Sequence, residues 1–371
     1  MSAPQILGQM RGLLAQLGGD AAVPPYVPIG QLIANGDLAS GEMTTLAASV
    51  NAVPFEPSQI GSRGLFEYQP ELTATVAVEF DGQVINVVPT TAPGAPPSDM
   101  DLRQRNVHIL SAPRIARRIT VNAMEVAGIR ALASTAMDTV ETRADRKLRN
   151  AVRDIRATLE YHRLGALFGI VLDADGATVL QNYFTLLGVE QPTFDVAFGT
   201  AGASKFIGIG ADLLNELEDA LGNLVPTSRP PVVFCGRAFF QRFVESADVI
   251  NAYQYFQANQ QRWNPLREDV RYEDFEHGGI IWRQYRGGTN NTGRFMPDDE
   301  AILVAEGVPG TYLGFFCPPQ DITSKVNTLG QPIYPTVKVL DHEMGYDIHL
   351  QSNPLHVMTR PAAAIKLFSS N

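Results

Sequence analysis

The pair His342 and Glu343 is the part of the chain that comes nearest to a metal-binding motif. A zinc-binding helix needs a second histidine three residues after that glutamate, and His349 comes too late. The pair also lies between segments of extended pattern, which favours a surface position. Cys235 and Cys317 lack the C-x-x-C spacing, so each is interpreted as a buried structural thiol. We therefore predict no metal site.

Motifs for phosphate and acyl chemistry are also missing from the sequence. It contains no G-x-x-x-x-G-K-[ST] loop and no G-x-S-x-G elbow. The sequence Gly208-Ile209-Gly210 lacks the third glycine of a dinucleotide-binding turn and follows no predicted strand. The acids of Asp298-Asp299-Glu300 could bind a cation, but acids after Pro297 are more typical of a solvated turn. We expect no catalytic residue and no cofactor, and hence no enzyme.

Basic side chains concentrate in one region of an acidic chain. The net charge of −10 argues against a dedicated nucleic-acid binder. Between Arg114 and Arg163, however, eleven Lys or Arg residues stand against six acids. Two interpretations stay open. This region is either a solvated helix face tied by pairs such as Asp145–Arg149 or a face turned toward phosphate.

The element that must position these side chains is a long amphipathic helix, predicted from Thr120 to Leu164. A rise of 1.5 Å per residue would make it roughly 65–70 Å long, more than a compact domain needs. Asn122 is the predicted N-terminal cap and Gly165 the predicted stop. Lys147 interrupts a strict heptad, which favours packing on a sheet over a coiled coil. Apolar residues form one stripe, namely Ile129, Leu132, Ala133, Ala136, Val140, Ala144, Leu148, Val152, Ile155 and Leu159.

The segments before this helix are not expected to fold as an independent domain. Residues 1–62 are broken by prolines and read as an extended arm. Residues 73–80 are a predicted strand, Asp81-Gly82 is a hairpin turn pair, and residues 83–88 resume the strand. A Pro/Gly-rich excursion follows, and residues 107–110 are a predicted returning strand. A lone ribbon is marginal in water, so arm and ribbon are expected to lie on another molecule.

Helices and strands alternate irregularly in the rest of the chain, which predicts an α+β fold. We expect a hairpin of 170–172 with 177–180, a helix over 204–221 and an aromatic-rich helix around Phe240. The remaining predicted strands are 232–235, 270–275, 279–285, a pair across Gly307–Gly310, 346–350, 355–359 and 364–368.

Composition limits the class of protein. A chain of 371 residues suggests two or three domains, and its longest nearly apolar run, Leu164 to Leu172, is far short of a membrane span. No secretory signal is expected, and the two cysteines fit a reducing cytoplasm. Charged residues make up 18%, a low share that is expected where neighbouring subunits cover much of the surface or where the core is large.

The C-terminal part carries a series of motifs that resembles the signature of the phage lambda major capsid protein E family. The matching segments occur in the family's order over some 70 residues. They are Arg294-Phe-Met-Pro-Asp-Asp-Glu-Ala-Ile-Leu-Val304, Glu306-Gly-Val-Pro-Gly310, Cys317-Pro-Pro-Gln-Asp-Ile322, Val326-Asn-Thr-Leu-Gly-Gln-Pro-Ile-Tyr334, Leu350-Gln-Ser-Asn-Pro-Leu355, Thr359-Arg-Pro361 and Ile365-Lys-Leu367. From the residues themselves, Gly310 and Gly330 are expected to supply turns that need positive φ.

This resemblance implies the tailed-phage major capsid fold. It implies an N-terminal arm (1–62), a strand with an extended β-hairpin loop (63–112), a peripheral domain with a long spine helix (113–200), an axial domain (201–340) and C-terminal strands returning to the peripheral domain (341–371). The implied function is self-assembly into hexamers and pentamers that form an icosahedral head around double-stranded DNA. Candidate contacts between subunits are Thr90, Pro93, Pro96, Arg103 and Arg105. Candidate genome-facing residues are Arg143, Lys147 and Arg153.

The implied partners are further copies of the chain, a portal, possible scaffold and decoration proteins, and packaged DNA, with no membrane. The implied location is the virion, after assembly in the cytoplasm of the host bacterium. Two other readings stay open: an encapsulin-type nanocompartment shell, which would share the fold, and a soluble enzyme, which would need a convergent polar pocket.

Overall fold

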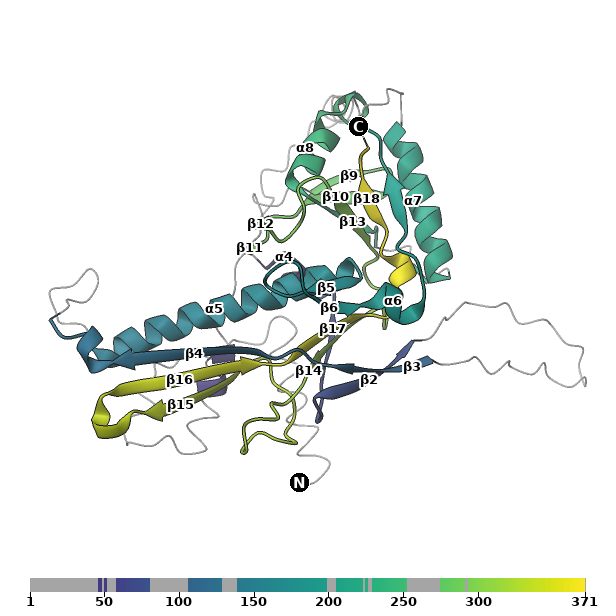
Figure 1. The fold of residues 1–371 in the computed structure, drawn as a ribbon. Helices are drawn as coiled ribbons and strands as arrows, with labels where there is room; N and C mark the ends of the chain where they lie inside the picture. The colour runs from purple at the N-terminus through teal and green to yellow at the C-terminus, as the bar shows by residue number, and fades with distance from the viewer. Residues whose placement is uncertain are drawn as a thin grey trace, which may run out of the picture. The chain divides into compact units, whose positions relative to one another are not determined.

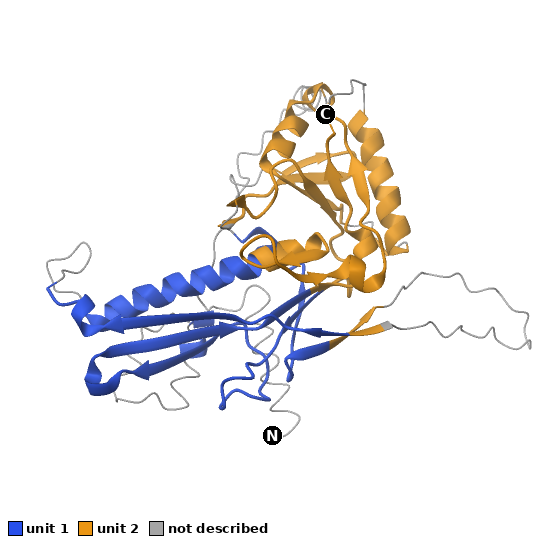
Figure 2. Cartoon of the chain, viewed as in Figure 1, with its two compact units in different colours: residues 1–76, 109–160, 313–356 blue, residues 77–108, 161–312, 357–371 orange. Residues whose placement is uncertain are grey.

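The chain folds into two compact units (Figure 2). Unit 1 comprises residues 1–76, 109–160 and 313–356, and unit 2 comprises residues 77–108, 161–312 and 357–371. The computed structural model describes residues 46–48, 50–51, 58–80, 106–128, 139–198, 205–222, 224–225, 229–251, 274–290 and 293–370. Both units are thus assembled from segments that are far apart in the sequence.

Helices and paired strands occur together in both units, which confirms the predicted α+β class. None of the described helices is both long and apolar enough to span a membrane. The helices are α4 (Gln59–Arg63), α5 (Val140–Leu167), α6 (Tyr183–Leu187), α7 (Lys205–Leu221) and α8 (Arg237–Glu245), with 3₁₀ helices η1 (Ala123–Glu125), η2 (Asp341–Glu343) and η3 (Pro361–Ala363). The strands are β1 (Glu67–Pro70), β2 (Thr75–Phe80), β3 (Asn106–Ser111), β4 (Ile115–Asn122), β5 (Ile170–Leu172), β6 (Val179–Asn182), β7 (Thr193–Asp195), β8 (Val232–Cys235), β9 (Asp274–His277), β10 (Ile280–Gln284), β11 (Thr289–Asn290), β12 (Gly293–Arg294), β13 (Ala301–Val304), β14 (Tyr312–Phe316), β15 (Tyr334–Val339), β16 (Gly345–Ser352), β17 (Pro354–Met358) and β18 (Lys366–Phe368).

The core of unit 1 is the seam between α5 and a three-stranded sheet of order β15-β16-β4 (Figure 1). β16 pairs antiparallel with both neighbours, so alternate side chains of each strand face the helix. The buried members of the seam include Ala144, Leu148, Val152 and Ile155 from the helix and Val121, Ile348 and Leu350 from the sheet. The apolar stripe that the sequence predicts is therefore confirmed from Ala144 onward, and so is its packing on a sheet.

The helix is shorter than its pattern predicts. Residues 115–122, whose end was expected to start the helix, form β4 instead, because this segment pairs along its whole length with β16. α5 begins only at Val140 and has 28 residues, which makes it about 42 Å long. The first part of the predicted stripe, residues 129–138, lies outside the described residues.

The ends of α5 also differ from the prediction. The N–H of Thr142 donates to Thr139 Oγ1 at 3.2 Å, so Thr139 takes the capping role predicted for Asn122. Gly165 lies inside the helix, where a Cβ would come within 2.9 Å of the Ile170 carbonyl oxygen. The turn at the C-terminus is made by Gly169, whose φ is 75°.

Unit 2 is built on a six-stranded sheet of order β7-β18-β13-β8-β10-β9, with α7 and α8 beside it (Figure 1). Trp282 of β10 stacks on Phe243 of α8, with ring centroids 4.5 Å apart, and meets Phe206 of α7 edge-on at 6.2 Å. Gly210 lets α7 approach the β9–β10 turn, because a Cβ there would lie 2.3 Å from the Gly278 carbonyl oxygen. An aromatic cluster thus holds both helices on the sheet.

Most of the predicted strands are confirmed, but one predicted pairing is wrong. β5 and β6 form the expected hairpin around Asp175-Gly176. The strands on either side of Gly307–Gly310 exist, yet they enter different sheets: β13 lies between β18 and β8, and β14 lies between β1 and β17. Each strand is already paired on both edges, so the two cannot form a hairpin.

The two glycines of the C-terminal motifs have different roles. Gly310 has φ of 68°, as the sequence predicts. Gly330 is not in the left-handed region, and its prediction is wrong. A Cβ at Gly330 would lie 1.7 Å from the Phe316 carbonyl oxygen, and its N–H donates to the Glu71 carbonyl oxygen at 2.8 Å. Close approach of the backbone, rather than turn geometry, is what requires glycine here.

A buried histidine in α5 gives unit 2 a testable dependence on pH. Burial lowers the pKa of His162 from its ordinary 6.5 to about 4, and its Nε2 finds no hydrogen-bond partner among the described residues. Between these two pKa values the unfolded chain binds a proton that the folded chain does not. This contribution to stability is therefore complete above pH 6.5 and falls as the pH drops toward 4, by on the order of 3 kcal/mol.

We predict that the unfolding free energy of His162→Gln falls less between pH 6.5 and pH 4 than that of the wild type. Urea unfolding at a series of pH values measures this loss. The control is His342→Asn, which removes an exposed histidine and should leave the slope unchanged, since asparagine tolerates the positive φ at that position. Equal slopes for the wild type and His162→Gln would contradict the assignment.

Candidate assembly and genome-facing surfaces

The candidate contacts between subunits all belong to the extended loop that the sequence predicts. Thr90, Pro93, Pro96, Arg103 and Arg105 lie outside the described residues, so their role stays a prediction. The two strands that lead into and out of the loop are described: β2 and β3 pair in a two-stranded sheet, as the sequence predicts.

The base of this ribbon has one buried face and one exposed face. Phe80 and His108 meet edge-on at 5.5 Å, and Val76 and Val78 are buried on the same side of β2. On β3, Val107 and Ile109 are exposed. The exposed face of β3 therefore carries two apolar side chains that no described residue covers.

Lys147, one of the genome-facing candidates, is bound within unit 1. Its Nζ lies 2.6 Å from Glu125 Oε2 and donates to the Thr120 carbonyl oxygen at 3.1 Å. The same hydrogen bond lowers the pKa of the Glu125 carboxyl. Lys147 thus ties the helix to η1 and to the end of β4, a structural role that accounts for the charge that interrupts the heptad.

The other two candidates lie on the side of α5 away from the seam. Steps of three and four place Arg143, Arg146, Arg149 and Arg153 on this outward side. Arg153 is exposed and Arg143 is half-buried. On one flank of the helix, Asp154 pairs with Arg117 of β4 at 2.5 Å, so this carboxylate is neutralised by a base from the sheet and not by an arginine of the helix. The outward side of α5 is therefore basic.

A buried carboxylate anchors the segment that precedes β1. Glu160 of α5 accepts the N–H of Ile60 at 2.7 Å, the N–H of Gly61 at 3.1 Å and the hydroxyl of Ser58 at 3.2 Å. These are donors at the first turn of α4, which would otherwise lack partners. Sequence reasoning missed this site, because the donors lie about a hundred residues from the acceptor.

We predict that Glu160→Gln destabilises the fold by about 1–3 kcal/mol, because the amide NH₂ must then face backbone N–H donors in a buried site. The comparison is Asp154→Asn, which breaks an exposed ion pair and should cost less than about 1 kcal/mol. The midpoints of urea unfolding measure both effects. Equal stability of the two variants would contradict the role of Glu160 as the anchor of α4.

The two cysteines and the acids at 298–300, which the sequence offers for chemistry, have structural explanations. Cys235 and Cys317 are buried, and burial raises the pKa of the first thiol and raises that of the second to about 12. The acids at 298–300 each face a different base: Asp298 lies 3.6 Å from Arg294, Asp299 lies 3.4 Å from Arg242 and Glu300 lies 2.6 Å from Lys366. Among the described residues no cluster of His, Cys, Asp or Glu could hold a metal ion.

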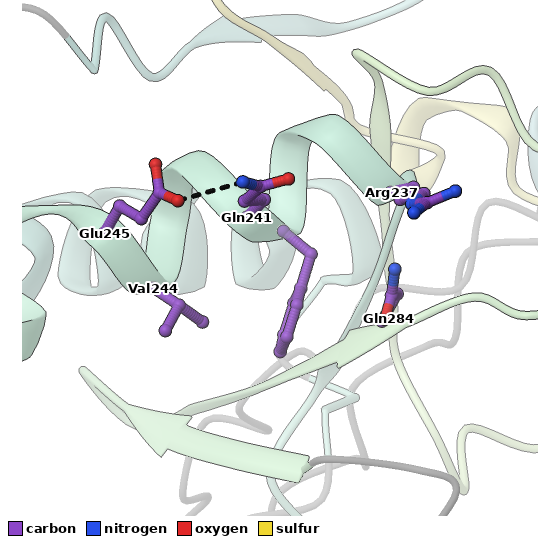
Figure 3. Close-up of a pocket in the computed structure, with 6 residues that line it drawn as sticks. Arg237, Gln241, Val244, Glu245 and Gln284 are labelled. Carbon is purple, nitrogen blue, oxygen red and sulfur yellow. Dashed lines mark hydrogen bonds between the residues drawn. The ribbon is translucent and has the colours of Figure 1, made fainter.

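A hollow of about 260 Å³ lies beside α8 in unit 2. Figure 3 shows Gln241 and Glu245 on the helix, joined by a hydrogen bond of 2.9 Å, with Arg237 and Gln284 toward its other end. Phe240 and Val244 complete the lining. The lining holds one carboxylate, Glu245, which accepts the hydrogen bond from Gln241, and it holds no histidine, cysteine or hydroxyl group that could pair with it as a nucleophile and its base.

Comparison with known proteins adds a family match. A family model described as phage major capsid protein E matches residues 42–369. The major capsid protein of Pseudomonas phage KPP10 is 26% identical over 145 residues, which are 36% of this chain and 41% of that protein. The chain therefore spans less than half the length of this relative.

Solved capsid structures are similar at low identity. The capsid of cyanophage P-SCSP1u is 11% identical with a TM-score of 0.47, over 83% of this chain and 88% of the other. The capsid of the myovirus XM1 is 10% identical with a TM-score of 0.46, over 83% of this chain and 90% of the other. The family model extends across every described helix and strand.

Proposed function

The chain belongs to the phage major capsid protein E family, and from this we propose that it is the shell subunit of a tailed phage with double-stranded DNA. Copies of the chain assemble into hexamers and pentamers that close into an icosahedral head. The observation that carries this proposal is the family match over residues 42–369. The family's description is that of a structural protein and not of an enzyme.

The build of unit 1 supports this function. Helix α5 covers one face of the β15-β16-β4 sheet, and the other face carries polar side chains. On that face Arg118 forms a two-pronged ion pair with Asp347, whose carboxyl pKa is lowered by these hydrogen bonds. A two-layer plate with polar surfaces on both sides suits a thin wall between two aqueous compartments.

The remaining partners of this function follow from a phage head. They are a portal and the packaged genome, with the use of a separate scaffold or a decoration protein left open, and the assembled protein resides in the virion after assembly in the host cytoplasm. Contacts with DNA are non-specific and electrostatic, made by the basic outward side of α5. Arg153 and Arg143 face the genome there, while Lys147 is bound to Glu125, which also lies near Arg143.

Deletion of Thr90–Met100 tests the contact between subunits. We expect the shortened chain to fold normally, because shortening the connection between β2 and β3 changes the entropy of loop closure little. We also expect it to lose most of its closed shells in sedimentation velocity. The matched control replaces the same residues with a Gly/Ser segment of equal length, which restores reach but not the side chains. A normal yield of shells from the deletion variant would contradict the proposal that these residues make contacts between subunits.

Substitution of Arg153 tests the genome-facing side of α5. Each phosphate contact contributes about one to the slope of the logarithm of affinity against the logarithm of salt concentration. We expect Arg153→Gln to lower that slope by about one for shells or subunits binding duplex DNA. The charge-preserving control Arg153→Lys should keep the slope. A slope that is the same for all three proteins would remove Arg153 from the genome-facing side.

A further inference from the structure

The N-terminal part of α7 meets the turn between β9 and β10 in unit 2. Gly278 of this turn lies so close to the helix that a Cβ there would come within 2.8 Å of the Phe206 carbonyl oxygen. A Cβ at Gly210 would in turn lie 2.3 Å from the Gly278 carbonyl oxygen. His277, the last residue of β9, is fixed beside this contact, because its carbonyl oxygen accepts the ring N–H of Trp282 at 3.1 Å. The backbone therefore sets the position of His277 relative to the first turns of α7.

The side chain of His277 lies on the face of the sheet that the helices cover. Phe275, two residues earlier on β9, shares this face, and its ring lies 5.8 Å from that of Phe243 of α8. The rings of Phe275 and His277 are 6.0 Å apart. The charged residues of the hairpin alternate to the opposite face, namely Asp274, Glu276 and Arg283, of which the first and last form an ion pair.

Asp248, in the helical turn after α8, supplies a negative charge at the N-terminus of α7. Its Oδ2 accepts the N–H of Lys205, the first residue of α7, at 2.8 Å. A helix leaves this N–H without an internal acceptor, and a carboxylate there also offsets the positive end of the helix dipole. The charge of Asp248 acts on His277 as well. The ammonium group of Lys205 is engaged elsewhere, since its Nζ donates to the Ala197 carbonyl oxygen.

The imidazole of His277 can compete for this carboxylate. Its Nε2 is shielded from solvent and has no hydrogen-bond partner among the described residues. Burial lowers the pKa of His277 below its ordinary 6.5, and the charge of Asp248 opposes that effect. The ring is therefore neutral at pH 7 and takes up a proton in more acidic solution. Once it is protonated, both ring nitrogens carry an N–H group, and the shielded Nε2 needs an acceptor.

We propose that His277 and Asp248 form an acid-sensitive switch at the N-terminus of α7. When the imidazole is protonated, the Asp248 carboxylate turns to the imidazolium and releases the N–H of Lys205. The first turn of α7 then frays, because it loses both a hydrogen-bond acceptor and the charge that offsets its dipole. The change reaches the core of unit 2, since Phe206 of that turn lies edge-on to Trp282. The switch lies within unit 2 and does not depend on the proposed shell function.

Hydrogen exchange of the full chain, measured by mass spectrometry from pH 7 to pH 4.5, tests the switch. After correction for the chemical exchange rate at each pH, we expect exchange in the first turn of α7 to rise about fivefold in the wild type, as for the loss of a helix cap. His277→Gln cannot take up a proton and should show no rise. The control is His162→Gln, which removes the buried histidine of α5 and should keep the rise. No rise in the wild type, or a rise that persists in His277→Gln, would overturn the proposal.

Asp248→Asn tests the other half of the switch and does not depend on how His277→Gln folds. The side-chain oxygen of asparagine can still cap α7, but it carries no charge that attracts an imidazolium. We therefore expect the ratio of exchange at pH 4.5 to exchange at pH 7 to fall to about one in the first turn of α7. A ratio equal to that of the wild type would show that the carboxylate takes no part, and the proposal would fail.

Discussion

Burial of one side of α5 against the β15-β16-β4 sheet is the constraint on which the rest of unit 1 depends. Leu148, Val152 and Ile155 of the helix are fully buried against Ile348 and Leu350 of the sheet. Once these residues define the inner side of the helix, the helical period fixes the direction in which every other side chain points. Glu160 reaches the first turn of α4, Lys147 reaches η1 and the arginines face outward. A single apolar stripe thus decides which charged side chains of the helix reach η1 and α4 and which face outward.

The sequence predicts this stripe well, because amphipathic periodicity is a local property of the chain. It predicts the start of the helix badly, since β4 also presents apolar residues at intervals, and only its pairing with β16 reveals it as a strand. Similarly, the pattern shows that two strands flank Gly307–Gly310 but not that each is already paired on both edges. Boundaries and pairings that depend on distant partners are what periodicity cannot supply.

The same limit applies to the surfaces. Residue type alone marks Lys147 as a genome-facing candidate, whereas its contacts with Glu125 and Thr120 show that it holds unit 1 together. Glu160 has no local signal at all, because its donors lie on a segment about a hundred residues earlier. The loop candidates from Thr90 to Arg105 lie outside the described residues and remain predictions. Local signals suffice elsewhere: both cysteines are buried, as the sequence predicts, and Asp298 and Asp299 lie exposed in a turn after Pro297, as their composition predicts.

Copies of this chain are proposed to tile a closed shell in which α5 packs on its sheet. Electron cryomicroscopy of particles assembled from the purified chain is the decisive measurement. We expect closed icosahedral shells tens of nanometres across, in which each subunit shows one straight helix of about 42 Å lying on a three-stranded sheet. Only dispersed subunits, or shells whose density lacks this helix on its sheet, would contradict it.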